Sequence, residues 1–171
     1  MDALRADGVG GIRIERLCRA LGVTKGSFHH HFDGIADYRS ALLGHIEARQ
    51  EGLLAGAAAA TKGRSAGEDF AALSAVAEAV RDIPLERAVR AWGMQDAEAS
   101  AVQSRIDAAQ LAFLTARWAA LLGDGTRARR AALIPFLVLI GSQATDAVGD
   151  ADLAGAFALL AELAPVVGRH P

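Results

Sequence analysis

The segment from Ile12 to Phe32, IRIERLCRALGVTKGSFHHHF, predicts two short helices joined by a tight turn. Its first half carries four apolar side chains at helical spacing, and together they form one stripe: Ile14, Leu17, Cys18 and Leu21. Gly22 follows where a left-handed residue commonly ends a helix, and Val23 can supply the accompanying apolar contact. Because Thr24 is a good cap for a second helix, the segment has the form of a helix-turn-helix.

The second of these helices, residues 25–31, has an apolar side and a polar side. Phe28 and Phe32 are four residues apart, which places both rings on the inward face. The outer face keeps Lys25, Gly26, Ser27, His29 and His30. In a helix-turn-helix the second helix enters the major groove, where a lysine reaches phosphate or guanine and a glycine allows close approach of the backbone. Ser27 and the start of the helix can bond a phosphate oxygen. On spacing alone, the alternative is an ordinary helical hairpin with a solvated charged face.

The string LGVTKGSF, residues 21–28, followed by His31 and Phe32, resembles the recognition segment of TetR-family transcriptional regulators. The resemblance implies an all-α fold in which residues 1–34 form a three-helix, helix-turn-helix DNA-binding unit. Residues 35–171 would then form a helical ligand-binding and dimerisation bundle. The resemblance also implies that the DNA-facing residues include Thr24, Lys25, Gly26, Ser27, His29 and His30.

Four features depart from the family pattern. The family usually has lysine at the start of the connecting helix, where this chain has Ile35. The family often has threonine near the start of the second helix, where this chain has Arg13, and an arginine there can replace a phosphate contact. His29 stands where the family usually has a tyrosine that contacts phosphate; histidine still donates a hydrogen bond but reaches less far. The first helix is short, because only residues 2–6 precede the first glycine turn, and we expect this to leave Leu17 and Phe28 exposed.

The composition and the spacing of apolar residues favour helices throughout. Alanine, the best helix former, occurs 39 times, and β-branched and aromatic residues are sparse. No stretch alternates with the period of two that is typical of a strand. The predicted helices cover residues 2–7, 12–20, 25–31, 35–60, 67–81, 84–95, 98–122, 126–147 and 151–167.

Charge is distributed unevenly along the chain. The formal net charge is −2, which by itself argues against a nucleic-acid partner. Residues 1–50, however, hold seven Lys/Arg, six Asp/Glu and four of the five histidines, while the remainder has a net charge of −3. Four basic residues of the first segment are offset only by Glu15: Arg13, Arg16, Arg19 and Lys25. Because DNA responds to a local patch rather than to the total, the sequence is compatible with DNA binding.

The sequence lacks the residue patterns that are typical of a metal site or of an enzyme. Adjacent helical residues point about 100° apart, so the consecutive residues His29, His30 and His31 cannot chelate one ion, and we expect no metal or other cofactor. No Ser/His/Asp group, paired carboxylates or glycine-rich phosphate loop is visible, so we expect no enzyme and assign no catalytic residue. Cys18 is expected to be a small core residue.

The chain starts without an apolar signal segment, and its longest apolar run, 131–140, is too short to span a bilayer. We therefore expect a cytoplasmic protein without membrane contact.

The resemblance implies that the bundle holds a small, apolar effector ligand. The candidate lining residues are Trp92, Gln95, Phe113, Trp118 and Phe136. For each aromatic residue the alternative is plain core packing. The last two predicted helices carry more apolar surface than one small bundle must bury, and the resemblance implies that residues 126–167 pair with a second copy of the chain. The alternative there is an intramolecular core.

Together these patterns predict a ligand-responsive transcriptional repressor that binds a palindromic operator as a homodimer, with its two recognition helices about 34–36 Å apart. The ligand would favour a conformer with the wrong spacing and so shift the population away from DNA. The alternative function is a helical small-molecule-binding or interaction dimer that has lost DNA binding.

Overall fold

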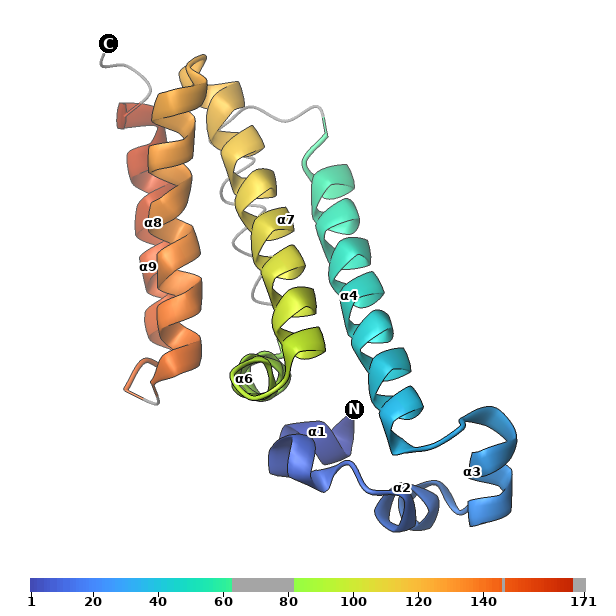
Figure 1. The fold of residues 1–171 in the computed structure, drawn as a ribbon. Coiled ribbons are helices and arrows are strands. Elements are labelled where there is room, and N and C mark those ends of the chain that lie inside the picture. Colours follow the sequence, from blue (N-terminus) through green and yellow to red (C-terminus); the bar gives the residue numbers. More distant parts are fainter. Residues whose placement is uncertain (63–81, 146, 168–171) are drawn as a thin grey trace. The chain divides into compact units, whose positions relative to one another are not determined.

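The structure, a computed structural model, describes residues 1–62, 82–145 and 147–167 and is all-helical over them, as predicted (Figure 1). Its elements are α1 (Asp2–Asp7), the 3-10 helix η1 (Gly8–Gly11), α2 (Ile14–Leu21), α3 (Lys25–His31), α4 (Ile35–Ala60), α6 (Ile83–Gly93), α7 (Ala97–Leu122), α8 (Gly125–Ala144) and α9 (Asp150–Val167). The predicted helix over 67–81 lies outside the described residues.

Three predicted helix boundaries are wrong by more than a residue. α6 ends at Gly93 instead of residue 95. α2 begins at Ile14 instead of residue 12, because Arg13 has an extended backbone with φ −133° and ψ 140°. α8 ends at Ala144 instead of residue 147, because Thr145 is extended as well. In the part of the chain that the structure describes, no helix is both long and apolar enough to cross a membrane.

The chain divides into two compact units. The first unit consists of Met1–Gln50 and Asp82–Ile106, and the second of Glu51–Arg81 and Asp107–Pro171. The first unit therefore adds α6 and the beginning of α7 to the predicted helix-turn-helix segment.

One apolar core holds the first unit together. Its most deeply buried large side chains are those of Leu4, Ile12, Leu43, Leu85 and Val89. Leu17 and Phe28 belong to the same cluster and are only 7% and 6% exposed, so the expectation that a short first helix exposes them is wrong. The reason is that α6 and α7 contribute apolar side chains to this core, and both α1 and η1 pack against α6. Cys18 is buried in the same core, as predicted.

The 3-10 helix η1 lies unusually close to α1. A Cβ atom built on Gly11 would lie 2.6 Å from the carbonyl oxygen of Ala3 and 2.9 Å from the Cβ of Asp7. Real Cβ atoms essentially never come so close to other atoms, and here one of the two neighbours is backbone. Only glycine allows this packing of the chain that leads into α2.

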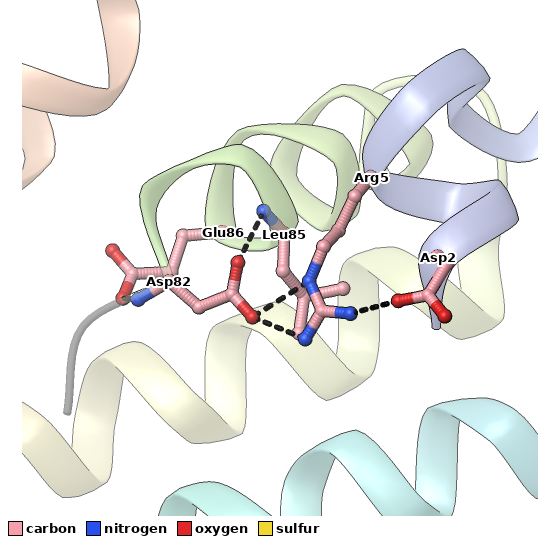
Figure 2. A network of polar contacts seen from close by, with 5 residues as sticks. All are labelled: Asp2, Arg5, Asp82, Leu85 and Glu86. Carbon is pink, nitrogen blue, oxygen red and sulfur yellow. Dashed lines mark hydrogen bonds and ion pairs between the residues drawn. The ribbon is translucent and has the colours of Figure 1, made fainter.

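A polar network ties α1 to the start of α6 (Figure 2). The guanidinium of Arg5 donates from Nε at 2.8 Å and from Nη2 at 2.5 Å to the same oxygen, Oδ2 of Asp82. The other oxygen of Asp82 caps α6 by accepting from the Leu85 N–H at 3.2 Å. The side chain of Asp82 is 14% exposed, and the hydrogen bond from Arg5 is the main cause that lowers its pKa. One carboxylate therefore both begins a helix and joins segments 77 residues apart.

We predict that Asp82→Ala lowers the free energy of unfolding by about 2 kcal/mol, since it removes both a helix cap and a charge-assisted hydrogen bond. Asp82→Asn keeps a cap acceptor and is expected to cost about half as much. Because folding lowers the pKa of Asp82, its contribution is complete above the ordinary carboxyl range and is lost as the pH falls below about 4. Urea unfolding at neutral and acidic pH measures both effects. Equal losses for the two variants at neutral pH would contradict a role for the helix cap, and an Asp82→Asn variant as stable as the unaltered chain would contradict a role for the charge.

The second unit contains its own apolar cluster and a pair of antiparallel helices. Its buried residues are Leu111, Trp118, Ala128, Ala132 and Ala164. Helices α8 and α9 lie side by side (Figure 1). The carboxylate of Asp124 caps α8 by accepting from the N–H groups of Thr126 at 2.7 Å and Arg127 at 3.0 Å. The helix continues through Pro135, which is buried.

Candidate nucleic-acid interface

The turn between α2 and α3 has the predicted glycine ending. Gly22 is left-handed, with φ 67° and ψ 26°. Its N–H donates to the carbonyl oxygen of Arg19 at 3.4 Å, and the N–H of Val23 donates to that of Cys18 at 3.0 Å. This pair of hydrogen bonds is the Schellman motif. It fixes where α2 ends and in which direction the chain enters α3.

Two apolar residues at this turn are more exposed than predicted. Leu21 is 69% exposed and Val23 is 41% exposed. The stripe on α2 therefore ends at Cys18, and the prediction that Leu21 continues it is wrong. Leu21 lies on the side of α2 that its spacing predicts. Neither Leu21 nor Val23, however, belongs to the buried cluster that covers the rest of the stripe.

The start of α3 is capped as predicted. The Thr24 hydroxyl oxygen accepts from the N–H of Ser27 at 3.1 Å, and the backbone of Thr24 is extended. The cap satisfies one of the free N–H groups at the start of the helix. A phosphate contact from Ser27 would therefore use its hydroxyl rather than its N–H.

An aromatic cluster attaches α3 to the beginning of α4. The ring of Phe28 lies 5.3 Å from that of Phe32 and 5.8 Å from that of Tyr38, and Phe32 and Tyr38 are 5.1 Å apart. Burial raises the pKa of Tyr38. The predicted inward face of α3 is thus confirmed for Phe28, which is buried, while Phe32 is half-buried. In the same unit, Nη2 of Arg39 donates to the carbonyl oxygen of Ile12 at 3.4 Å and so joins α4 to the chain before α2.

All the predicted DNA-facing residues are exposed: Arg13, Thr24, Lys25, Gly26, Ser27, His29 and His30. Six of them lie together on or just before α3, and Arg13 directly precedes α2 without a side-chain cap hydrogen bond. A Cβ atom on Gly26 would meet only the Thr24 hydroxyl oxygen, at 3.6 Å, so the surface there is open. The sequence of α3, KGSFHHH, contains no acidic residue.

Two carboxylates accompany the basic residues of this surface. Lys25 Nζ lies 2.6 Å from Oε1 of Glu15, and this hydrogen bond is the main cause that lowers the pKa of Glu15. Arg16 pairs with Asp7. The sequence predicts that Glu15 offsets the basic patch, but it does not predict the same of Asp7, because only the turn through η1 brings this carboxylate back to α2.

The arginines of α2 line a hollow on this surface. Its volume is about 730 Å³, and its lining residues are Asp7, Gly10, Arg13, Glu15, Arg16 and Arg19. The guanidinium of Arg13 donates from Nε to the carbonyl oxygen of Gly10 at 3.1 Å. Three of the four residues of the predicted basic patch therefore border one concave surface.

The predicted ligand-binding residues are divided between the two units. Trp92 is 3% exposed in the core of the first unit, and Gln95 is exposed in the same unit. Phe113, Trp118 and Phe136 belong to the second unit. Trp118 and Phe136 share its apolar cluster, and the Cζ of Arg117 lies 5.7 Å from the centre of the Phe113 ring. The packing of Trp92 fits the core alternative.

Within the described residues, no three or more His, Cys, Asp or Glu side chains gather where they could hold a metal ion. Comparison of the chain with protein-family models, with curated proteins and with solved structures finds no significant match.

Proposed function

We propose that this chain is a DNA-binding transcriptional regulator of the TetR type, a repressor that inserts α3 into the major groove of a palindromic operator. The observation that carries the proposal is the two-sided character of α3. Its Phe28 side is anchored in the core, and its opposite side presents lysine, serine and histidines to solvent without an acidic residue. This is the arrangement that a recognition helix needs, because its first residues meet base edges and phosphates.

The two ion pairs near α3 do not oppose this function. The side chains of Lys25 and Glu15 are 59% and 61% exposed, and those of Arg16 and Asp7 are about as open. Ion pairs so exposed are weak and are screened by salt. Lys25 can therefore exchange the carboxylate of Glu15 for a DNA phosphate. The arginines of α2 add to the positive field beside the same helix.

The second unit supports a homodimer. Four large apolar side chains on its paired helices are open to solvent: Ile134, Leu137, Leu159 and Leu163. The two on each helix are three or four residues apart and so share one side of it, and exposed apolar faces of this kind mark interaction sites in soluble proteins. Pairing of α8 and α9 with their copies would create a two-fold axis, and such symmetry matches a palindromic operator.

An apolar effector is part of the same proposal. Phe113, Trp118 and Phe136 give the second unit the aromatic side chains that a small apolar ligand needs. In the first unit, Tyr38 and Arg39 join α4 to the helix-turn-helix, so a shift of α4 would carry α3 with it. A ligand that prefers the shifted conformer would release the operator.

The test is selection of bound sequences from a pool of random duplexes about three helical turns long, at low salt. We expect enrichment of a palindrome with half-sites about one turn apart. A folded, dimeric chain that enriches no sequence and binds no duplex would overturn the proposal and support the alternative of a dimer without DNA binding.

Replacing Lys25 tests the interface itself. We predict that Lys25→Ala weakens DNA binding and reduces the slope of log K against log salt by about 0.9, because one phosphate contact is lost. Lys62→Ala is the matched control, since it removes the other lysine of the chain, an exposed residue of the second unit, with the same change in charge. Fluorescence anisotropy across a salt series measures both slopes. An unchanged slope in Lys25→Ala would remove this residue from the interface.

A further inference from the structure

The proposed recognition helix, α3, carries three consecutive histidines, and the proposed function does not use their change of charge. His29, His30 and His31 are all exposed. Histidine is the side chain whose charge ordinarily changes between about pH 5 and 8. A DNA-facing surface that holds several imidazoles can therefore change its charge under ordinary conditions.

The geometry of α3 puts one of these imidazoles at the centre of the outer face. With about 100° of rotation per residue, His30 lies roughly opposite the buried Phe28, on the same line as Gly26 one turn earlier. Gly26 has no side chain that could cover the imidazole ring. His29 lies on the flank of this face, and His31 turns back toward the side of Phe28.

Charged and titratable groups surround α3 on the elements packed against it. They are Glu15, Arg16 and Arg19 on α2, Lys25 on α3 itself, Asp33 in the following loop, and Asp37 and Tyr38 on α4. Glu15 is bound to Lys25, Arg16 to Asp7, and Asp37 accepts from the N–H of Asp33 at 3.1 Å. Within the described residues, His29 and His30 make ring contacts only, with Phe28 at 5.5 Å and His31 at 5.1 Å. Both imidazoles are thus available to an incoming anion.

We infer that DNA binding by this chain is coupled to proton uptake by His29 and His30; the inference rests on the proposed function. A protonated imidazole donates from both ring nitrogens and adds a positive charge, whereas the neutral ring donates from one. A neighbouring phosphate favours the protonated form. The complex then holds more protons than the free chain and duplex, so affinity rises as the pH falls.

The size of the effect follows from the number of protons. Each proton taken up on binding changes the affinity by at most about tenfold per pH unit. With two histidines coupled in part, we expect an affinity roughly tenfold or more higher at pH 6 than at pH 8. The salt slope should steepen at the lower pH, because a protonated imidazole adds a phosphate contact.

The experiment measures dissociation constants of the full chain from about pH 6 to about pH 8 at constant ionic strength. Two probes are used, the duplex enriched by selection and a random duplex of the same length. The variants are His29→Gln with His30→Gln, and the matched control His45→Gln, which removes an exposed histidine of α4. Circular dichroism at each pH checks that the variants remain folded.

The outcomes separate the two proposals. Affinity that falls with rising pH in the unaltered chain and in His45→Gln, but not in the double variant, supports proton coupling at these residues. Binding with the same affinity at every pH overturns this inference and leaves the proposed function standing. A pH dependence that persists in the double variant overturns the assignment to His29 and His30. Absence of binding at every pH overturns the proposed function itself.

Discussion

Replacing Phe28 with alanine is expected to lower the free energy of unfolding of the chain by about 3–5 kcal/mol. Phe28 is 6% exposed and contacts both Phe32 and Tyr38. The substitution removes buried aromatic surface and leaves a cavity at the point where α3 meets α4. Since domains are stable by only about 5–15 kcal/mol, the loss is a large part of the total. Urea unfolding followed by circular dichroism measures it, and Phe28→Leu provides a milder step if the alanine variant does not fold.

The matched control for this substitution is Leu21→Ala. Leu21 lies at the end of α2, in the same unit, but is 69% exposed. Its replacement should change stability by no more than about 0.5 kcal/mol, as is usual for surface positions. Equal losses for the two variants would mean that the core extends over Leu21, contrary to the exposure in this structure.

Introducing charge on the exposed face of α8 and α9 is expected to convert a dimer into a monomer. Leu137 is 60% exposed and Leu163 is 46% exposed. In the proposed dimer both would be covered, and a buried aspartate without a partner is strongly unfavourable. We predict that the double variant Leu137→Asp, Leu163→Asp is monomeric and binds operator DNA at least about 100-fold more weakly. The reason is that the second half-site is no longer bound as part of the same complex.

Sedimentation equilibrium gives the mass of each variant, and anisotropy gives its affinity for DNA. The control is Met94→Asp, which places the same charge on another exposed apolar residue, 85% exposed, in the first unit. This control should remain dimeric. A double variant that is still dimeric would place the subunit interface elsewhere.

Local signals in the sequence were sufficient to predict where most helices begin and end. Thr24 caps α3 with its hydroxyl, and the left-handed Gly22 ends α2. These features act over a few residues, so neighbouring sequence determines them. The bounds of α1, α3 and α4 agree with the prediction, and the Thr24 cap is the reason for the start of α3.

The sequence does not predict which distant segments of the chain contact one another. Nothing near Arg5 indicates that it meets Asp82, because the two are brought together only by the packing of α1 on α6. The burial of Leu17 was mispredicted for the same reason, since α6 and α7 complete its surroundings. Residues 1–34 do not bury their core alone, and their own sequence does not show this.

The sequence predicts which side chains of α3 point outward at the candidate interface, but it does not predict which charged residues there form ion pairs. Helical periodicity alone assigns Phe28 to the inside and His30 to the outside of α3, and both assignments agree with the structure. The partner of Arg16 depends on the path of the chain through η1, which periodicity does not describe. The ligand-binding candidates are predicted from residue type alone. Residue type does not distinguish a residue that lines a pocket from one that is packed in an apolar core, as Trp92 is.

The close approach of Gly11 to α1 restricts which substitutions the chain can accept at this position. Any side chain at this position would have to displace the backbone of Ala3, whereas a Cβ atom at Gly10 meets nothing within 4 Å. Two neighbouring glycines thus differ sharply in the substitutions they accept. In a library of all single substitutions, Gly10 should tolerate many residues, while Gly11 should be almost invariant among variants that still fold. That single position limits the range of first helices that can pack against η1 and the start of α2.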